Sequence, residues 1–439
     1  MACDGHWRGN PPPVLGRFAH DTRRMRGGET FVALRGERAD GHEHLAAAQE
    51  RGAIAALVER PRAEVSLPQL IAQDSLGALQ RIATAARREF SGPVVGVTGS
   101  FGKTTVREML GCALGDGWYR TRENFNNHIG LPLSLLELVA AGAEGAILEA
   151  GINKAGEMEL LAGILQPDHA VITGVGPAHL EQLGDLDGVA REKARLAAAV
   201  PAGGLVVLPL ELLRYARFRE AVAGKRAIAL AGEKESNPSG LPGNVAIYHY
   251  KQTDYSGRLS FAAESRGMLR NLALVTAMAG ALGREADSIR EGLAAWRPFR
   301  HRGEVRAWGK RLYYVDCYNA NPASMIDSME RFTRRFADRP HFYVLGGMEE
   351  LGPAAADWHR DTARRLPLLP GNPVALVGEA AAWYREGLAE RTDGPWQPRV
   401  VEEVDDLGAD LENFEGAVFL KGSRRHALER LLPEEATPC

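Results

Sequence analysis

The stretch VVGVTGSFGKTTVREML (94–110) has the residue types of a phosphate-binding loop. A short apolar run comes first, a glycine-rich turn follows, and apolar residues recur at helical spacing after Lys103. Backbone N–H groups at the start of such a helix bind anions, the lysine reaches phosphate oxygens, and a threonine hydroxyl binds Mg²⁺. We therefore predict a nucleotide-phosphate site at Gly99, Ser100, Phe101, Gly102, Lys103, Thr104 and Thr105.

The loop departs from the usual G-x-x-x-x-G-K-[ST] pattern, because Val97 stands where that pattern has a glycine. One alternative is a plain strand–turn–helix junction with a surface lysine. The strand-like run before the loop and the amphipathic pattern after it favour a phosphate site of a variant kind.

Two further polar side chains follow apolar, strand-like runs. Glu149 ends GAILE (145–149), and His179 follows HAVITGV (169–175). If these runs are parallel strands, both side chains lie at the sheet edge where ligands bind. Glu149 is then a candidate Mg²⁺ ligand near Thr104, and His179 could serve a second cation. A solvated acid and a structural histidine are the alternatives.

Other candidates depend more heavily on context. In ENFNNHIGLPLSLLEL (123–138), Asn126 and Asn127 precede a helical pattern that they could simply cap. Arg302 and Asp316 could hold the ribose and phosphates of a nucleotide from a second side, or be an ordinary surface arginine and strand-end acid. By itself, Lys193 is indistinguishable from an exposed lysine.

The elements that must position these residues belong to a multidomain α/β chain. At 439 residues the chain is long for one core. We predict a small α/β unit at 1–90, a central doubly wound unit at 91–298 and a Rossmann-like unit at 299–439, because strand-like runs alternate with helical patterns. Residues 246–261 resemble an antiparallel insertion, and the final PEEATPC (433–439) a frayed tail.

Composition limits the possible partners. A net charge of −3 provides no basic field for nucleic acid or an anionic membrane. The four cysteines are scattered without metal-ligand spacing, which is typical of reduced thiols. The start has no apolar segment of a secretory signal, and no apolar run approaches the roughly 20 residues of a membrane span. We expect a soluble cytoplasmic protein.

Taken together, the motifs resemble those of the ATP-dependent Mur ligase family, which adds amino acids to a peptidoglycan precursor. TGSFGKTT is similar to the family's phosphate loop, ENFNNHIGLP to N-x-N-N-x-I-G-x-P, and GPAHLEQLG to G-x-A-H-L-E-x-x-G. The resemblance covers about residues 14–431. DCYNANPASM and the segment from Asp21 to His42 are similar to the branch that adds D-alanyl-D-alanine to UDP-N-acetylmuramoyl-tripeptide.

This resemblance implies the chemistry and the roles of the units. It implies ATP-dependent amide formation through an acyl phosphate, with two Mg²⁺ ions, one held by Thr104 and Glu149 and the other by His179 and a carbamylated Lys193. The first unit would bind the UDP-sugar, the second ATP, and the third would close on the nucleotide and bind the incoming dipeptide or amino acid. We expect a monomer. ATP contacts are also implied for Asn271, Arg302, Asp316 and Asn319, and substrate contacts for Asp21, Arg23, Asn126, Asn127, Tyr318 and Asn321.

Some positions depart from the family's pattern. Arg270 replaces a histidine, Leu274 an asparagine and Gly347 an aspartate. These departures leave open a related ligase that joins a different amine or acceptor. A phosphate-loop NTPase switch is a further alternative, which predicts hydrolysis without an acceptor and leaves the N-terminal unit unexplained. The true substrates stay open at this point.

Overall fold

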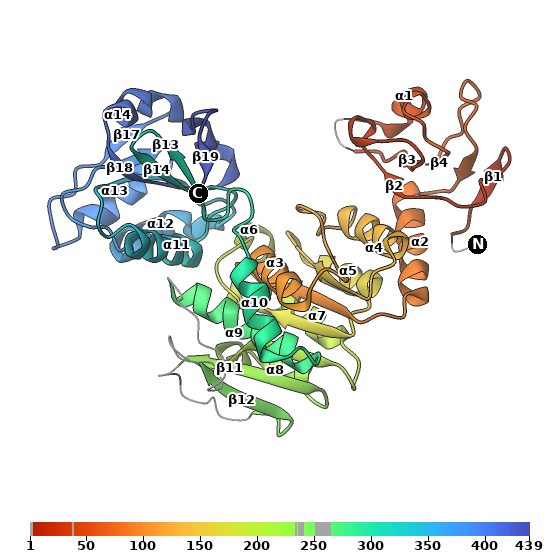
Figure 1. Cartoon of the computed structure of the whole chain (residues 1–439), viewed down its shortest axis with the longest axis horizontal. Coiled ribbons are helices and arrows are strands. Elements are labelled where there is room, and N and C mark those ends of the chain that lie inside the picture. The colour runs from red at the N-terminus through yellow and green to blue at the C-terminus, as the bar shows by residue number, and fades with distance from the viewer. Residues whose placement is uncertain (1–2, 37–38, 233–234, 236–240, 251–264) are drawn as a thin grey trace.

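A computed structural model describes residues 3–36, 39–232, 235, 241–250 and 265–439. The chain forms three α/β units, each around its own sheet (Figure 1). The N-terminal and C-terminal units lie on opposite sides above the central unit in this view, so the predicted three-unit α/β architecture is confirmed. None of the helices in the described ranges has the length and apolar character of a membrane span.

The N-terminal unit contains a five-stranded sheet in the order β1-β5-β4-β3-β2, in which only β1 runs antiparallel to its neighbour. Helix α2 packs against α4 and α5 of the central unit and so connects the two units. The Asp74 carboxylate caps its first turn by accepting from Leu76 N–H. The elements are β1 (His6–Arg8), β2 (Phe18–Ala19), β3 (Thr30–Val32), α1 (Leu45–Glu50), β4 (Ala55–Val58), β5 (Gln69–Ile71) and α2 (Ser75–Glu89).

The central unit is a seven-stranded, entirely parallel sheet in the order β12-β11-β10-β9-β6-β8-β7. Its strands are β6 (Val94–Thr98), β7 (Trp118–Arg120), β8 (Gly145–Glu149), β9 (His169–Ile172), β10 (Leu205–Pro209), β11 (Arg226–Gly232) and β12 (Val245–Tyr250). Its helices are α3 (Lys103–Leu114), α4 (Gly130–Ala141), α5 (Glu157–Leu165), α6 (Leu180–Leu183), α7 (Leu186–Ala199), α8 (Ala216–Val222), α9 (Arg266–Ala281) and α10 (Ala286–Ala295).

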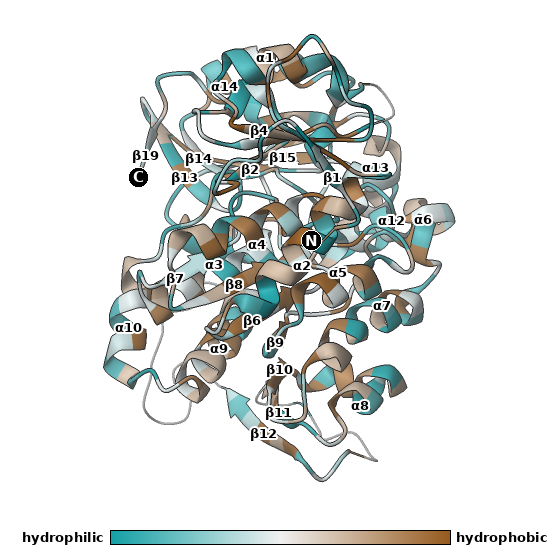
Figure 2. Ribbon diagram, turned by 90° about the vertical axis from the view of Figure 1, so that its right-hand side faces the viewer, coloured by the Kyte–Doolittle hydropathy of each residue, from teal (hydrophilic) through white to brown (hydrophobic). Residues whose placement is uncertain are grey.

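Alternate residues of the central strands face two separate cores. In β6, Val94 faces the helices α4, α5 and α7, whereas Val95 and Val97 face α3, α9 and α10. Both faces are therefore apolar, as a parallel sheet covered by helices requires, and β9 and β10 are largely brown in Figure 2. Strand β6 lies between β8 and β9, so the loop after β6 opens at the point where the strand order reverses.

The C-terminal unit has a mixed seven-stranded sheet in the order β17-β16-β15-β18-β14-β13-β19. Helices α11, α12 and α13 cover one face, and α14 with the 3₁₀ helix η7 (Leu428–Leu431) covers the other. The elements are β13 (Glu304–Trp308), β14 (Arg311–Asp316), α11 (Pro322–Arg335), β15 (His341–Gly346), α12 (Ala355–Arg365), β16 (Val374–Val377), α13 (Ala381–Ala389), β17 (Arg399–Val401), α14 (Gly408–Glu412), β18 (Gly416–Lys421) and β19 (Thr437–Pro438).

Two sequence predictions about strands were wrong. The segment 246–250 belongs to β12, which pairs parallel to β11; the rest of the predicted antiparallel insertion lies outside the described residues. As an edge strand, β12 is partly exposed and has the alternating pattern usual in antiparallel hairpins. The C-terminal tail is also not frayed, because β19 pairs with β13 and Cys439 N–H donates to Val305 C=O at 3.0 Å.

Candidate functional site

The predicted phosphate loop joins β6 to α3 at the carboxyl edge of the central sheet. Gly102 adopts φ +75°, and a Cβ at Gly99 would lie 1.9 Å from Thr173 Oγ1, so both positions favour glycine. Ser100 N–H donates to Gly174 C=O at 2.9 Å, which fixes the loop against the segment after β9. The loop therefore presents the amino end of a 12-residue helix toward the sheet edge.

Lys103 is the first residue of α3 and points back along the loop. Its Nζ donates to Gly99 C=O at 2.7 Å. Burial lowers the pKa of Lys103, while Glu149 opposes that shift. The ammonium lies where a phosphate bound at the start of the helix would meet it.

Glu149, at the end of β8, is buried and interacts with several polar side chains. Its carboxylate accepts from Thr104 Oγ1 at 2.9 Å and from Asn126 Nδ2 at 2.8 Å. Arg107 Nη1 lies 3.3 Å from the same carboxylate. Burial alone would raise the pKa of Glu149, but Arg107, Lys103 and Arg302 together hold the pKa below its usual range. A buried anion therefore sits beside the phosphate loop.

Arg107 was missed by the sequence analysis. Its side chain is completely buried and also contacts Glu108 and the Glu123 carbonyl. Because Arg107 follows Thr104 by three residues on α3, both lie on one helix face and reach Glu149 together. This three-residue spacing from Thr104 is the sequence signal that could have identified Arg107 as a site residue.

Lys193, on α7, is only 1% exposed. Within the described part of the chain, its Nζ has no hydrogen-bond or ion-pair partner. Burial and the charge of Lys103 lower its pKa well below the ordinary value, although Glu192 and Glu149 oppose the shift. The structure thus favours a neutral amine close to the charged groups of the site.

His179 has φ +57° and precedes α6. Its Nδ1 contacts the carboxylate of Glu350, which belongs to the C-terminal unit, and Leu180 N–H donates to Glu350 C=O at 2.8 Å. Glu350 was not predicted as a site residue. It pairs with His179 across 171 residues of sequence, a contact that no local pattern indicates.

The C-terminal unit brings several predicted residues to the phosphate loop. Asn321 Nδ2 donates to Ser100 C=O at 3.2 Å. The Arg302 guanidinium lies 4.1 Å from the centre of the Tyr318 ring, and its buried Nε has no hydrogen-bond partner among the described residues. An unpaired donor beside a phosphate loop fits an anionic ligand such as a nucleotide phosphate.

The loop after β14 is fixed by Lys421. This buried lysine lies 3.1 Å from the Asp316 carboxylate, and its Nζ donates to Asn319 C=O at 2.9 Å. A cavity of about 680 Å³ lies between this loop and the central unit. The predicted residues that line it are Ser100, Phe101, Gly102, Lys103, Thr105, Asn126, Asn127, Glu149, His179, Asn271, Arg302, Asp316, Tyr318, Asn319 and Asn321.

Arg270 and Asn271, near the start of α9, contact the phosphate loop. Arg270 pairs with Glu211 at 3.2 Å and lies 5.9 Å from the centre of the Phe101 ring. Asn271 approaches Gly102 so closely that a Cβ there would lie 2.9 Å from Asn271 Oδ1. Arg270, which stands where the family pattern has a histidine, therefore packs against the phosphate loop from α9.

Asp21 and Arg23 lie away from this cavity, in the N-terminal unit. They pair with each other at 2.8 Å, and Arg23 lowers the pKa of Asp21 to about 2. Asn127 Oδ1 accepts from Gly130 N–H at 2.8 Å and so supports the start of α4. The proposed substrate contacts of these residues stay predictions.

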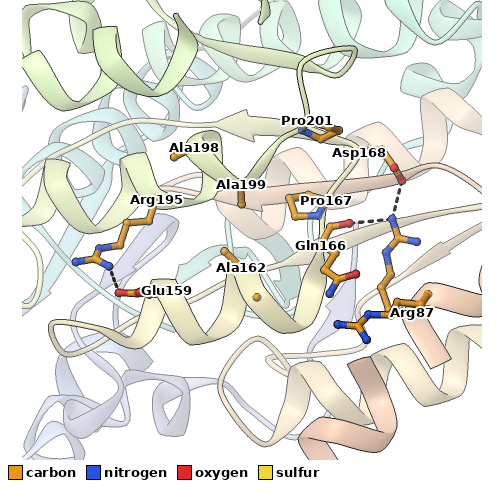
Figure 3. A pocket seen from close by; sticks show the side chains of 12 residues that line it. Arg87, Glu159, Ala162, Gln166, Pro167, Asp168, Arg195, Ala198, Ala199 and Pro201 are labelled. Carbon is orange, nitrogen blue, oxygen red and sulfur yellow. Dashed lines mark hydrogen bonds and ion pairs between the residues drawn. The ribbon is translucent and has the colours of Figure 1, made fainter. Parts of the chain in front are cut away.

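A second hollow, of about 830 Å³, lies at the opposite edge of the central sheet (Figure 3). Arg87 lies on one side of it and donates to Asp168 at 2.7 Å and to Gln166 C=O at 2.8 Å. Asp168 also accepts from Val94 N–H at 2.8 Å. These groups already satisfy one another and tie strand starts together, so the hollow is a structural feature.

Comparison with known proteins agrees with this geometry. The Mur ligase family, catalytic domain, matches residues 18–88; the Mur ligase middle domain matches residues 97–265; and the Mur ligase, glutamate ligase domain, matches residues 301–424. The UDP-N-acetylmuramoyl-tripeptide–D-alanyl-D-alanine ligase of Treponema pallidum (strain Nichols) is 32% identical, over 94% of this chain and 92% of that protein.

Solved structures are similar over nearly the whole length. A crystal structure of MurF from Acinetobacter baumannii has a TM-score of 0.82 and 28% identity, covering 98% of this chain and 96% of that chain. MurF ligase from Thermotoga maritima in complex with ADP has a TM-score of 0.75 and 27% identity, covering 95% and 96%.

Proposed function

This chain belongs to the Mur ligase family, and from that membership we propose that it joins D-alanyl-D-alanine to UDP-N-acetylmuramoyl-tripeptide with the consumption of ATP. Three relatives named UDP-N-acetylmuramoyl-tripeptide–D-alanyl-D-alanine ligase match 94–97% of this chain, and so all three units. The product is a peptidoglycan precursor. The use of ATP and of a nucleotide-linked precursor supports a cytoplasmic location. The expectation of a monomer stays a prediction.

The first step is phosphoryl transfer. The terminal carboxylate of the tripeptide attacks the γ-phosphorus of ATP, forming an acyl phosphate and releasing ADP. The N–H groups at the start of α3 and the Lys103 ammonium bind the phosphates and stabilise the charge that develops on the transferring group. Arg302, whose buried Nε has no hydrogen-bond partner in the part of the chain that the structure describes, lines the same cavity from the C-terminal unit.

The second step forms the amide. The dipeptide amine attacks the acyl carbon, and the resulting tetrahedral intermediate releases inorganic phosphate. Water would hydrolyse the acyl phosphate, so the site must be enclosed. Asn321 and Glu350 of the C-terminal unit already contact the central unit, and Arg302 lines the cavity between the two units. These positions support closure of the C-terminal unit over the reactants.

The donor set fits Mg²⁺. Thr104 Oγ1 and the Glu149 carboxylate are hard oxygen donors 2.9 Å apart beside the phosphate loop, and they would hold one ion. Bound Mg²⁺ supplies neutralisation of phosphate charge. A carbamate forms from a neutral amine and CO₂, and Lys193 is buried, without a partner in the described ranges, and of lowered pKa. Carbamylated Lys193 and His179 would hold the second ion.

The observation that carries the proposal is the hydrogen bond between Thr104 and Glu149 beside the phosphate loop. The C-terminal unit contacts this same loop through Asn321. The test incubates the full chain with ATP, Mg²⁺, UDP-N-acetylmuramoyl-tripeptide and D-alanyl-D-alanine. We expect one phosphate released per amide formed, and a product heavier than the acceptor by the dipeptide less one water.

Omitting single components separates the alternatives. Phosphate release with no amine and no acceptor would indicate an NTPase switch and contradict the ligase assignment. Phosphate release only with another amine or another acceptor would retain the ligase chemistry and replace the substrates. Arg270 and Gly347 are the departures that motivate including other amines.

A further inference from the structure

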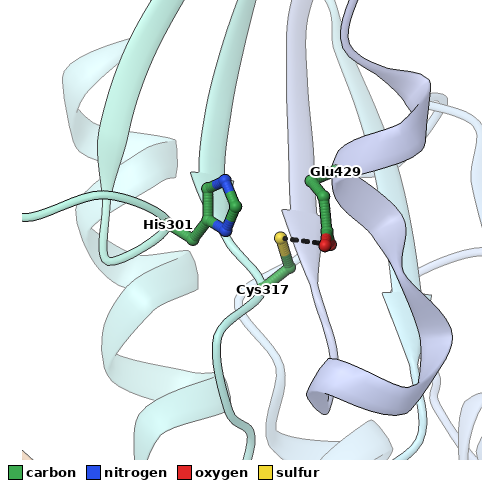
Figure 4. Close-up of side chains that lie close together, drawn as sticks. All are labelled: His301, Cys317 and Glu429. Carbon is green, nitrogen blue, oxygen red and sulfur yellow. Dashed lines mark hydrogen bonds between the residues drawn. The ribbon is translucent and has the colours of Figure 1, made fainter. Parts of the chain in front are cut away.

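Three side chains of different types meet in the C-terminal unit, outside the cavity described above. His301, Cys317 and Glu429 each offer a ligand atom, and within the described ranges these three atoms lie within 4.8 Å of one another (Figure 4). They come from the segment before β13, the loop after β14 and η7. His301 and Cys317 are buried. An imidazole, a thiol and a carboxylate are the donor types of zinc sites.

The contacts within this cluster show which groups a cation would displace. Cys317 Sγ donates to Glu429 Oε2 at 3.6 Å. Burial, with Glu429 and Asp316 nearby, raises the pKa of the thiol. Arg424 Nη1 lies 2.9 Å from His301 Nδ1 and 3.2 Å from Glu429 Oε1. The guanidinium thus occupies the position of a cation between two of the donors.

We propose that His301, Cys317 and Glu429 form a site for a thiophilic divalent cation of the Zn²⁺ type, in competition with Arg424. Without the metal, the negative charge of the Glu429 carboxylate and the positive charge of the Arg424 guanidinium cancel. With the metal, the thiolate and the carboxylate balance its two charges, and one proton leaves Cys317 as the sulfur–metal bond forms. Arg424 can then turn outward, because its side chain is 58% exposed.

The place of the site in the fold indicates what it would do. His301 immediately precedes Arg302, and Cys317 lies between Asp316 and Tyr318. A cation would therefore tie the two segments that line the cavity to η7 and hold them in position. This role is structural, and it is independent of the proposed ligase reaction because metal binding is measured without substrates.

The test uses the full chain, freed of metal by a chelator and titrated with Co²⁺ alone. We expect one tightly bound ion per chain, a thiolate-to-cobalt absorption band, about one proton released, and displacement of the band by Zn²⁺. Cys317→Ser should remove the band and weaken binding by at least about 100-fold, since even outer-shell changes alter metal affinity by roughly 10–100-fold. Cys112→Ser is the matched control, because Cys112 lies on α3 outside the cluster.

Two further variants keep the proposal falsifiable if Cys317→Ser misfolds. Arg424→Ala should bind Co²⁺ more tightly, by about tenfold, because the competing guanidinium is gone. Glu429→Gln should bind it more weakly with the thiolate band altered. Absence of a thiolate band in wild type, an unchanged band in Cys317→Ser, or unchanged affinity in Arg424→Ala would each overturn the proposal.

Discussion

Lys103 is the residue on which phosphate binding is expected to depend most directly. It begins α3, and its ammonium lies over the loop at 2.7 Å from Gly99 C=O. We expect Lys103→Ala to lower kcat for amide formation by about 10²–10³-fold, the usual cost of one preorganised charge-stabilising group. The measurement is ADP and amide product in the same reaction.

The matched control is Lys310→Ala, because Lys310 is 75% exposed and pairs with Glu415 in the C-terminal unit. It should retain wild-type rates. If Lys103→Ala still releases ADP in proportion to product at the wild-type rate, the assigned role of Lys103 is wrong.

Lys193 is expected to be needed for ligase activity and to lower the stability of the fold. Lys193→Met removes an amine that is buried without a partner in the described ranges and leaves an apolar chain of similar length. In CO₂-free buffer near neutral pH we expect the free energy of unfolding to rise by about 1–3 kcal/mol, measured by urea denaturation. Ligase activity should be lost, because the proposed carbamate cannot form.

The pH dependence has a definite sign. The pKa of Lys193 is lower in the folded chain than its ordinary value of 10.5. Between the two values the unfolded chain binds more protons, so this group makes stability rise with pH and its penalty vanishes above about 10.5. The stability difference between Lys193→Met and wild type should therefore shrink across that range. A constant difference would contradict the lowered pKa.

At the scale of elements, the start of α11 has two functions that can be separated. Asn321 Oδ1 accepts from Ser324 N–H at 2.9 Å, which caps the helix, while Nδ2 donates to Ser100 C=O of the phosphate loop. Serine also caps helices but has no amide donor. Asn321→Ser should therefore keep the unfolding midpoint near wild type and raise the KM for ATP by about fivefold, the value of one hydrogen bond.

Asn321→Ala should lose both functions. We expect it to cost about 1 kcal/mol of stability in addition to the same change in KM. Equal KM values for wild type and Asn321→Ser would show that the contact with Ser100 does not contribute to nucleotide binding. Thermal unfolding and steady-state kinetics on the two variants provide the measurements.

At the scale of the whole molecule, the C-terminal unit is held to the central unit by contacts distant in sequence. Glu350 contacts His179, and Asp327 accepts from Gly267 N–H at the start of α9. Glu350→Gln removes the charge of one contact. We expect the radius of gyration of the nucleotide-free chain to increase in small-angle scattering and the KM for ATP to rise, because the closed arrangement is less populated.

The neighbouring Glu349→Gln provides the control. Glu349 lies near Arg425 and His426 of its own unit, at 3.6 and 3.7 Å. Its substitution should leave the radius of gyration unchanged. If both variants behave alike, the His179–Glu350 contact does not hold the units together.

Local chemistry explains how much of the fold and site the sequence predicted. The glycines, Lys103 and Thr104 could be placed because a strand, a tight turn and a helix start leave their own residue pattern. The parallel central sheet followed from alternating strands and helices, and Glu149 from its position at a strand end. The alternation of polar and apolar residues could not predict whether β12 pairs parallel or antiparallel, since an exposed edge strand shows this alternation in both cases.

The sequence by itself determined the order of elements, the phosphate loop and the family resemblance, because these depend on neighbouring residues and their spacing. Only the tertiary structure decided the rest: the Arg107 contact with Glu149, the burial of Lys193, the His179–Glu350 pair and the pairing of the C-terminal tail. Each of these depends on chain segments that packing brings together, and on the desolvation that packing imposes, neither of which a local pattern encodes.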